Sequence, residues 1–225
     1  MFTGFQDSMV DFLWGIRFND ERSWFEENKP VYLTQVQQPM RQLGEALYAY
    51  MQRTYPELWL NLHVSRIYRD ARRLHGRGPY KDHLWLSLRH ENENWTSRPV
   101  FYFEIAPEGW SCSMGFYSAT PAVMERFRQA VWADPKPPEQ LTAALNAQSE
   151  FVLEGPEYAR KKPSPTPLLE PWMSRKTFSL CCDRTYEDAA PFSEELVERL
   201  CRGFDFLVPY YRYFEQFCRD EAQFH

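Results

Sequence analysis

Hydrophobic positions near the start of the chain repeat at the spacing of an α-helix. The apolar positions of the first predicted helix are Phe5, Met9, Phe12, Leu13 and Ile16. A second helix is predicted to begin at Glu21, with Asn19 or Asp20 as its capping residue. Pro30 and Pro39 lie in this second pattern and are expected to kink or split it, because proline lacks an amide donor and crowds the preceding turn.

The middle of the chain changes to the two-residue period of β-strands. The predicted strands are residues 61–69, 83–90, 100–106 and 110–117. In residues 83–90, leucines at every second position define one apolar face. Pro107 and Gly109 separate the last two strands and form a good hairpin signal. Consecutive strands of this kind predict an antiparallel meander.

Helical patterns return in the second half of the chain. Thr120-Pro121 is typical of a helix start. This helix is expected to break at 134–138 and to be followed by a short helix at 141–147 and an irregular wrapping segment at 155–171. A last strand is expected at 177–182, and after it a C-terminal helical region that is interrupted near Gly203 or Pro209. The fold class is therefore predicted as α+β, with an antiparallel sheet of about four to six strands packed by N- and C-terminal helices. Residues 1–225 are interpreted as a single domain.

Composition narrows the possible functions. The chain has 225 residues, 17% of them aromatic, and a net charge of -5, and this acidic balance argues against a general nucleic-acid coat protein. No run reaches the roughly 18 apolar residues of a membrane helix, and the N-terminus lacks the basic start of a signal peptide. The cysteines, Cys112, Cys181, Cys182, Cys201 and Cys218, form no CxxC pair and no zinc-finger spacing with histidine. We therefore predict a cytoplasmic protein with no membrane contact, no metal and no cofactor.

Residues 66–90, the basic segment, stand out against this acidic background. The segment holds seven Lys and Arg residues, two acids and three of the chain's five histidines. Like charges that are crowded on one surface repel one another, and an anion usually relieves that repulsion. The alternative is that Asp70 and Asp82 pair with these bases on a solvated face, but two acids cannot neutralise seven bases.

The basic segment supplies the candidate site residues. Arg69, Arg72, Lys81 and His83 are predicted to converge on a phosphate or carboxylate if the loop folds back across the strand ends. Alternation along a strand would place Arg66 and Arg69 on opposite faces unless a bulge intervenes. Tyr80 and Arg175 are the supporting candidates. His83, at the start of a predicted strand, is the candidate general acid or base.

Three motifs resemble a bacterial family catalogued only as a domain of unknown function. Residues 19–29, NDERSWFEENK, are similar to its N-D/N-R-x-W-F-x-x-N-K signature, and residues 66–72 and 79–83 to its R-I-x-R-D-x-R and P-Y-K-x-H signatures. The chain departs from the family pattern after Arg72, where Arg-Leu-His-Gly-Arg replaces Phe-Ser and a lysine. The resemblance implies an α+β fold and no established activity.

Three functional hypotheses remain open at this stage. The leading one is a domain that binds a small phosphorylated or carboxylated ligand in a basic, aromatic-rimmed pocket. The second is a metal-independent enzyme of the phosphoryl or acid–base type, in which His83 moves the proton and the arginines hold the charge. The third is a protein or nucleic-acid interaction module that uses the basic segment as its contact.

Overall fold

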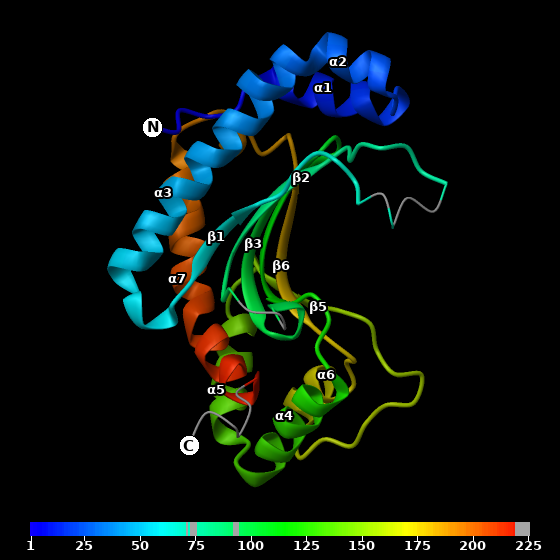
Figure 1. Cartoon of the computed structure of the whole chain (residues 1–225). Helices are drawn as coiled ribbons and strands as arrows, with labels where there is room; N and C mark the ends of the chain where they lie inside the picture. Colours follow the sequence, from blue (N-terminus) through cyan, green and yellow to red (C-terminus); the bar gives the residue numbers. More distant parts are fainter. Residues whose placement is uncertain (71, 73–75, 92–94, 219–225) are drawn as a thin grey trace. The chain divides into compact units, whose positions relative to one another are not determined.

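The computed structural model describes residues 1–70, 72, 76–91 and 95–218, and it has an α+β fold. Its antiparallel sheet has six strands in the order β1-β2-β3-β4-β6-β5, with helices at both ends of the chain (Figure 1). The predicted fold class is confirmed. The contacts group the chain into two compact units, and the single-domain interpretation stays a prediction.

The first unit consists of Met1–Leu88, Tyr102–Cys112 and Asp183–Arg202, and the second of Arg89–Phe101, Ser113–Cys182 and Gly203–His225. All side chains of the candidate site except Arg175 belong to the first unit. No helix of the described residues combines the length and the apolar character that crossing a membrane requires.

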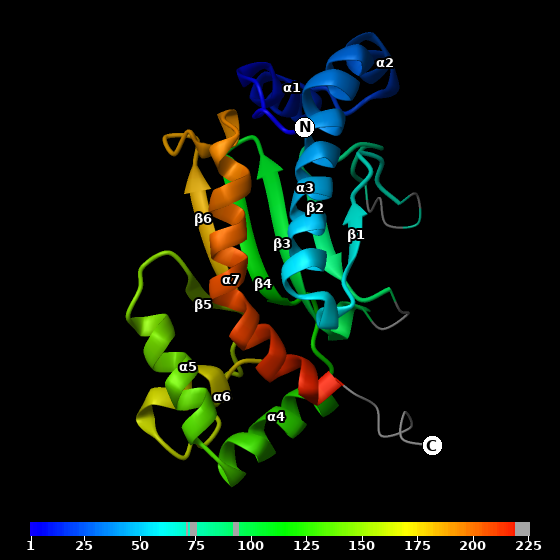
Figure 2. The same ribbon diagram turned by 90° about the vertical axis from the view of Figure 1, so that its left-hand side faces the viewer.

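The N-terminal helices follow the predicted pattern closely. They are α1 (Asp7–Phe18), α2 (Arg22–Val31), the π-helical η1 (Tyr32–Gln37) and α3 (Gln38–Thr54). The two prolines flank the π-helical segment, with Pro30 inside α2 and Pro39 in the first turn of α3. The helical run changes type between them but continues from Arg22 to Thr54, so the chain is not split there. Helix α3 runs along β1 (Figure 2), and a side chain at Gly44 of α3 would collide with Leu62 of that strand.

The predicted cap of α2 is wrong. Glu21 occupies the capping position, and no side chain caps the helix. Asn19 instead donates from its side chain to the carbonyl of Gly15 at the end of α1. Asp20 accepts the backbone N–H of Tyr80 at 2.8 Å. The Asp20 side chain therefore binds a loop that is distant in the sequence and does not serve as the helix cap that the local sequence pattern predicts.

The central strands are β1 (Asn61–Val64), β2 (Leu84–Arg89), β3 (Pro99–Ala106) and β4 (Gly109–Phe116), followed by β6 (Ser179–Thr185). The hairpin of β3 and β4 turns at the predicted Pro107-Glu108 step. Strand β1 is shorter than predicted, because the chain leaves the sheet after Val64 and forms a separate bridge between Tyr68 and Tyr80.

The remaining elements belong mainly to the second unit. They are α4 (Pro121–Ala133), α5 (Lys136–Asn146), β5 (Val152–Glu154), α6 (Glu170–Met173) and α7 (Glu195–Glu215). The described residues include the short 3-10 helices η2 (Pro56–Leu58), η4 (Trp95–Ser97), η5 (Pro167–Leu169), η6 (Ala190–Phe192) and η7 (Gln216–Cys218). Thr120 caps α4 as predicted, with its hydroxyl accepting the N–H of Val123 at 3.3 Å.

Several predictions about this part of the chain need correction, including the start of α5, which lies at Lys136 and not at Leu141. Strand β5 was not predicted, and it pairs antiparallel with β6 from Val152 to Glu154. Its three residues are too short a pattern to recognise in sequence. Helix α7 continues through Gly203 and Pro209 without interruption. A Cβ at residue 203 would lie 3.1 Å from the ring of Phe151, so the glycine serves packing and does not break the helix.

Candidate functional site

The loop between β1 and β2 is held in place by a short ladder. The N–H of Arg69 donates to the carbonyl of Pro79 at 2.8 Å, and the N–H of Lys81 donates to the carbonyl of Ile67 at 2.7 Å. Tyr68 and Tyr80 face each other across this ladder, with ring centroids 5.4 Å apart. Arg69 and Lys81 therefore occupy positions next to that cross-strand pair, on two backbone segments that are held together.

Helix α2 braces the same ladder from outside. The Phe25 ring stacks on Tyr80 at 4.3 Å, and both side chains are buried. The side chain of Asp20 lies against Gly78, where a Cβ would meet the Asp20 carboxyl carbon at 2.3 Å. These contacts fix the loop against Asp20 and α2.

Four side chains form one row of contacts, which we call the Lys81 row: Lys81 before β2, Trp85 on β2, and Tyr102 and Glu104 on β3. The amine of Lys81 lies 5.8 Å from the centroid of the Trp85 ring. The rings of Trp85 and Tyr102 are 5.7 Å apart, and the Tyr102 hydroxyl donates a hydrogen bond to the Glu104 carboxylate. The row thus joins a cation, two aromatic surfaces and an acid–phenol pair.

The electrostatics of the row centre on Lys81. Burial and the nearby positive charges of Arg69 and Arg66 lower the pKa of the Lys81 amine to about 8, and Glu104 opposes this effect. Both arginines therefore act on the same amine. The regular strand ends at Val64, before either residue, and the placement of Arg66 and Arg69 on opposite faces stays a prediction.

Arg69 is held with an unsatisfied nitrogen. Its Nε is shielded from solvent and has no hydrogen-bond partner within the part of the chain that the structure describes. The nearest carboxylate is that of Asp20, 3.9 Å from this nitrogen. Buried donors are normally hydrogen-bonded, so an orphaned guanidinium nitrogen beside a second cation indicates local affinity for an acceptor.

The other predicted site residues have different surroundings. Tyr80 is buried against Phe25, and burial raises the pKa of its hydroxyl. Arg72 is exposed, and the residues around it, 71 and 73–75, lie outside the described residues. Arg175 belongs to the second unit, where its guanidinium donates to the carbonyls of Gly155 and Leu153 and so ties β5 in place.

His83 belongs to an ion network instead of the Lys81 row. Its Nδ1 lies 3.0 Å from the Asp82 carboxylate, which also accepts from Arg17 Nε at 2.6 Å. Arg17 continues the network to Glu108 in the β3–β4 turn. Burial alone would raise the pKa of Asp82, but the hydrogen bonds from His83 and Arg17 lower it to about 2. The carboxylate thus stays charged and satisfied.

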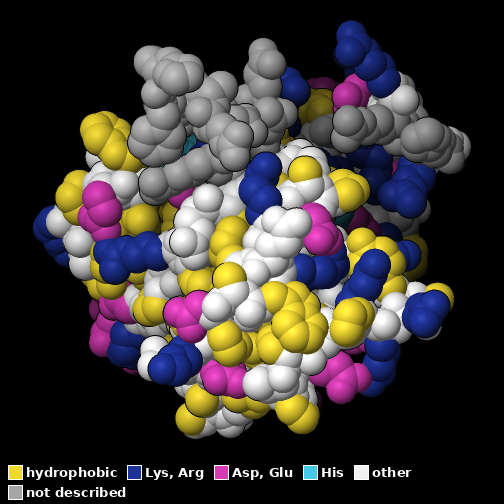
Figure 3. Space-filling view, turned by 90° about the horizontal axis from the view of Figure 1, so that it is seen from below, with side chains coloured by type: hydrophobic (Ala, Val, Ile, Leu, Met, Phe, Trp, Pro, Cys, Tyr) yellow, Lys and Arg dark blue, Asp and Glu magenta, His cyan; other side chains and the backbone are white. Residues whose placement is uncertain are grey.

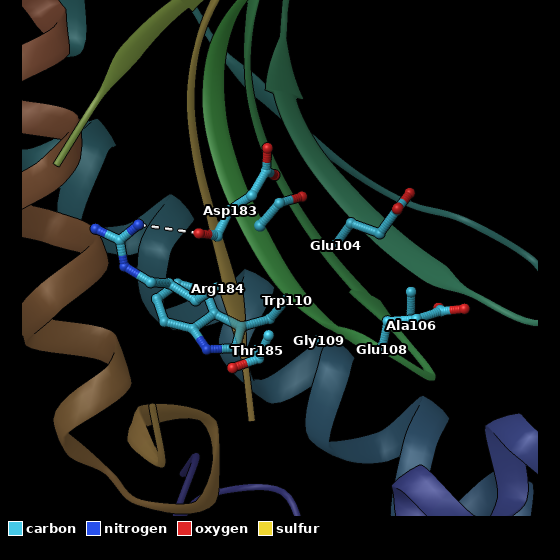
Figure 4. A pocket seen from close by; sticks show the side chains of 9 residues that line it. Glu104, Ala106, Glu108, Gly109, Trp110, Asp183, Arg184 and Thr185 are labelled. Atoms are coloured by element: carbon cyan, nitrogen blue, oxygen red, sulfur yellow. Dashed lines mark hydrogen bonds between the residues drawn. The ribbon is translucent and has the colours of Figure 1, made fainter. Parts of the chain in front are cut away.

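A hollow of about 330 Å³ adjoins the acidic end of the row. It is lined by Glu104, Ala106, Glu108, Gly109, Trp110, Ser111, Asp183, Arg184 and Thr185. Glu104 and Asp183 project to one side of the strands and the Trp110 ring to the other (Figure 4). Glu104 therefore belongs both to this hollow and to the Lys81 row.

Sequence reasoning missed Trp85, Tyr102 and Glu104 as site residues. Their signal was present in the alternation, because each is a polar or amphipathic residue between buried positions of β2 or β3. Alternation identifies such a face but does not tell which strands lie side by side. That Lys81 and Glu104 lie near each other could be recognised only from the order of the strands and from the ladder that holds the loop.

The visible surface and the metal-binding side chains point to no further site among the described residues. In Figure 3, acidic and basic side chains are interspersed among hydrophobic ones on the visible face, so its described residues form a mixed surface. Within the described residues, no group of three or more His, Cys, Asp or Glu side chains has a metal-binding arrangement.

Comparison with known proteins gives a family assignment. No curated protein matches the chain. A family model described as a conserved hypothetical protein (DUF2461) matches residues 8–213, which include the whole loop ladder and the Lys81 row. The chain therefore belongs to the DUF2461 family.

Proposed function

We propose that this protein binds a small anionic molecule, phosphorylated or carboxylated, beside Lys81. The observation that carries the proposal is the crowding of positive charge there. The Lys81 amine is half-buried, and two of the charges that act on it are the arginines Arg69 and Arg66. A bound anion stabilises crowded, partly buried cations because it offsets both their mutual repulsion and their loss of hydration.

Each part of the row has a role in this proposal. Lys81 and Arg69 provide the cationic donors, and Arg69 Nε has no hydrogen-bond partner among the described residues. The Trp85 ring offers a flat apolar surface beside the amine. Glu104, which borders the hollow, suits hydroxyl groups of the same molecule. His83, Arg72, Tyr80 and Arg175 remain candidates of the sequence analysis that further binding data must test.

Titration with two simple anions tests the proposal. Inorganic phosphate and malonate, at constant ionic strength, are expected to raise the melting temperature of the wild-type protein and to release or absorb heat in calorimetry. Lys81→Gln should weaken binding about 10- to 150-fold, because a hydrogen bond to a charged group contributes roughly 1.5–3 kcal/mol. Lys136→Gln, which removes an exposed lysine of α5, is the matched control.

Two outcomes contradict the proposal. One is the absence of any response of the wild type to either anion. The other is an equal loss of affinity in the Lys81 and Lys136 variants, which would indicate general charge attraction. In either case, salt-dependent binding of a nucleic acid or an acidic protein would favour the interaction module instead.

A further inference from the structure

The Lys81 amine has the environment of a nucleophile as well as that of an anion anchor. Its backbone N–H is fixed by the carbonyl of Ile67 at 2.7 Å, and its Nζ is directed over the Trp85 ring. The Lys81 side chain is thus half-buried against an aromatic ring, whereas that of Lys136 on α5 is exposed.

An acid–phenol pair lies in the same row. The Tyr102 hydroxyl donates to the Glu104 carboxylate, and the Tyr102 ring contacts the Trp85 ring over which the amine lies. Glu104 is also a charge that acts on Lys81 directly. The row therefore contains a nitrogen nucleophile from the segment before β2, and a proton acceptor and a proton donor from β3.

We propose that Lys81 Nζ forms an imine with a small carbonyl compound that carries a phosphate or a carboxylate. This inference rests on the proposed function, because the anion is held by the same cations. It adds the substrate class, an anionic aldehyde or ketone, and it replaces His83 with Lys81 as the residue that touches the reacting atom.

The chemistry balances without any oxidant or reductant. The lone pair of the neutral amine adds to the carbonyl carbon, and the electrons of the C=O π bond move to the oxygen, which takes up a proton. The nitrogen then loses a proton, for which Glu104 is the proposed acceptor. Glu104 then returns this proton to the hydroxyl oxygen, which leaves as water while the nitrogen lone pair forms the C=N bond. Amine, carbonyl compound and the one proton taken up by the oxygen thus give the protonated imine and water.

The charges around the amine favour this reaction near neutral pH. The facing groups are Arg66 and Arg69 after β1, the Trp85 ring on β2 and Glu104 on β3. Burial, Arg69 and Arg66 lower the amine pKa from 10.5 to about 8 despite the opposing Glu104. At pH 7 the fraction of neutral amine is then about 300-fold higher than for an ordinary lysine.

Reductive trapping tests the inference. The wild-type protein is incubated with pyridoxal 5′-phosphate or with glyoxylate, in each case with cyanoborohydride, and the modified lysine is located by peptide mass spectrometry. We expect Lys81 to be modified first, with a rate that is half-maximal near pH 8. Pyridoxal, which lacks the phosphate, is the matched probe and should react at least about tenfold more slowly.

Variants separate this inference from the proposed function. Lys81→Arg keeps the positive charge but cannot form the imine, so it should lose labelling and retain most of the phosphate affinity. Arg66→Gln should shift the half-maximal pH of Lys81 labelling upward, because it removes a charge that lowers the amine pKa. A merely structural Lys81 would give neither the pH midpoint nor the effect of Arg66.

Three outcomes would overturn the inference. They are labelling spread over exposed lysines without preference for Lys81, a midpoint near that of an ordinary lysine, and equal rates with pyridoxal and its phosphate. If phosphate still binds the wild type in calorimetry, only the imine is refuted. If phosphate also fails to bind, the proposed function fails with it.

Discussion

Lys81 and Asp82 are neighbours in the sequence, but their charges are in opposite situations. The Asp82 carboxylate accepts hydrogen bonds from Arg17 and His83, which overcome the effect of its burial and lower its pKa to about 2. The Lys81 amine is lowered to about 8 by burial and by Arg69 and Arg66. One shift stabilises the charged form, and the other destabilises it.

The comparison separates a structural ion network from a candidate binding group. A carboxylate with two partners has little left to offer a ligand, and its network joins α1 to the start of β2 and to the β3–β4 turn. An amine among like charges keeps its capacity for a partner. The basic segment therefore contains a paired charge at Asp82 and, at Lys81, an amine whose pKa is lowered by burial and by like charges.

The largest expected effect is the loss of the Asp82 network. Asp82→Ala should lower the free energy of unfolding by about 2–3 kcal/mol at pH 7, since Arg17 and His83 lose a charged acceptor. Because the folded pKa is depressed, this contribution is present above pH about 4 and is lost as the pH falls towards 2. Urea unfolding of wild type and variant should therefore converge in acid, and a constant difference would contradict the assignment.

The next effect in size is the pH dependence that Lys81 imposes on stability. A lysine with a lowered folded pKa binds fewer protons when folded, so stability should rise as the pH increases from about 8 towards 10.5. We expect a rise of about 1–2 kcal/mol after solvent screening is allowed for. Lys81→Gln should abolish this rise, whereas Lys136→Gln should keep it, and urea unfolding at several pH values measures both.

The smallest effects compare two arginines of the basic segment. Arg66→Gln should weaken phosphate binding about three- to tenfold, since Arg66 acts on the Lys81 amine. Arg72→Gln should weaken it less than about twofold, because its side chain is exposed and screened by salt. Calorimetry ranks the two variants, and a larger effect of Arg72 would extend the anion site into the loop around residues 71–75.

Local sequence was sufficient for most of the elements. Helical spacing predicted α1, the Thr120-Pro121 start predicted α4, and the Pro107–Gly109 turn predicted the β3–β4 hairpin. These features depend on interactions within a few residues, which a sequence pattern contains. The cap of α2 failed for the complementary reason, because Asp20 is bound by Tyr80, sixty positions away.

The basic segment was a site candidate from composition alone, and the choice of Lys81 and Arg69 as ligand-binding residues stays a prediction. The structure adds that the charge of Arg69 lowers the pKa of the Lys81 amine. Composition could not distinguish Lys81 from its neighbour Asp82, nor assign His83 to the Asp82 network. A charge is satisfied only if the fold brings a hydrogen-bond partner to it, and the partner of Asp82, Arg17, is 65 residues away in the sequence.

By itself the sequence determined the α+β class, the alternating faces of β2 and β3 and the excess of positive charge in residues 66–90. Only the tertiary structure decided that Glu104 and the two arginines act on one amine. The physical reason is distance. Alternation and propensity act between chain neighbours, whereas a Coulomb interaction or a desolvation penalty depends on what packing brings close, wherever it lies in the chain.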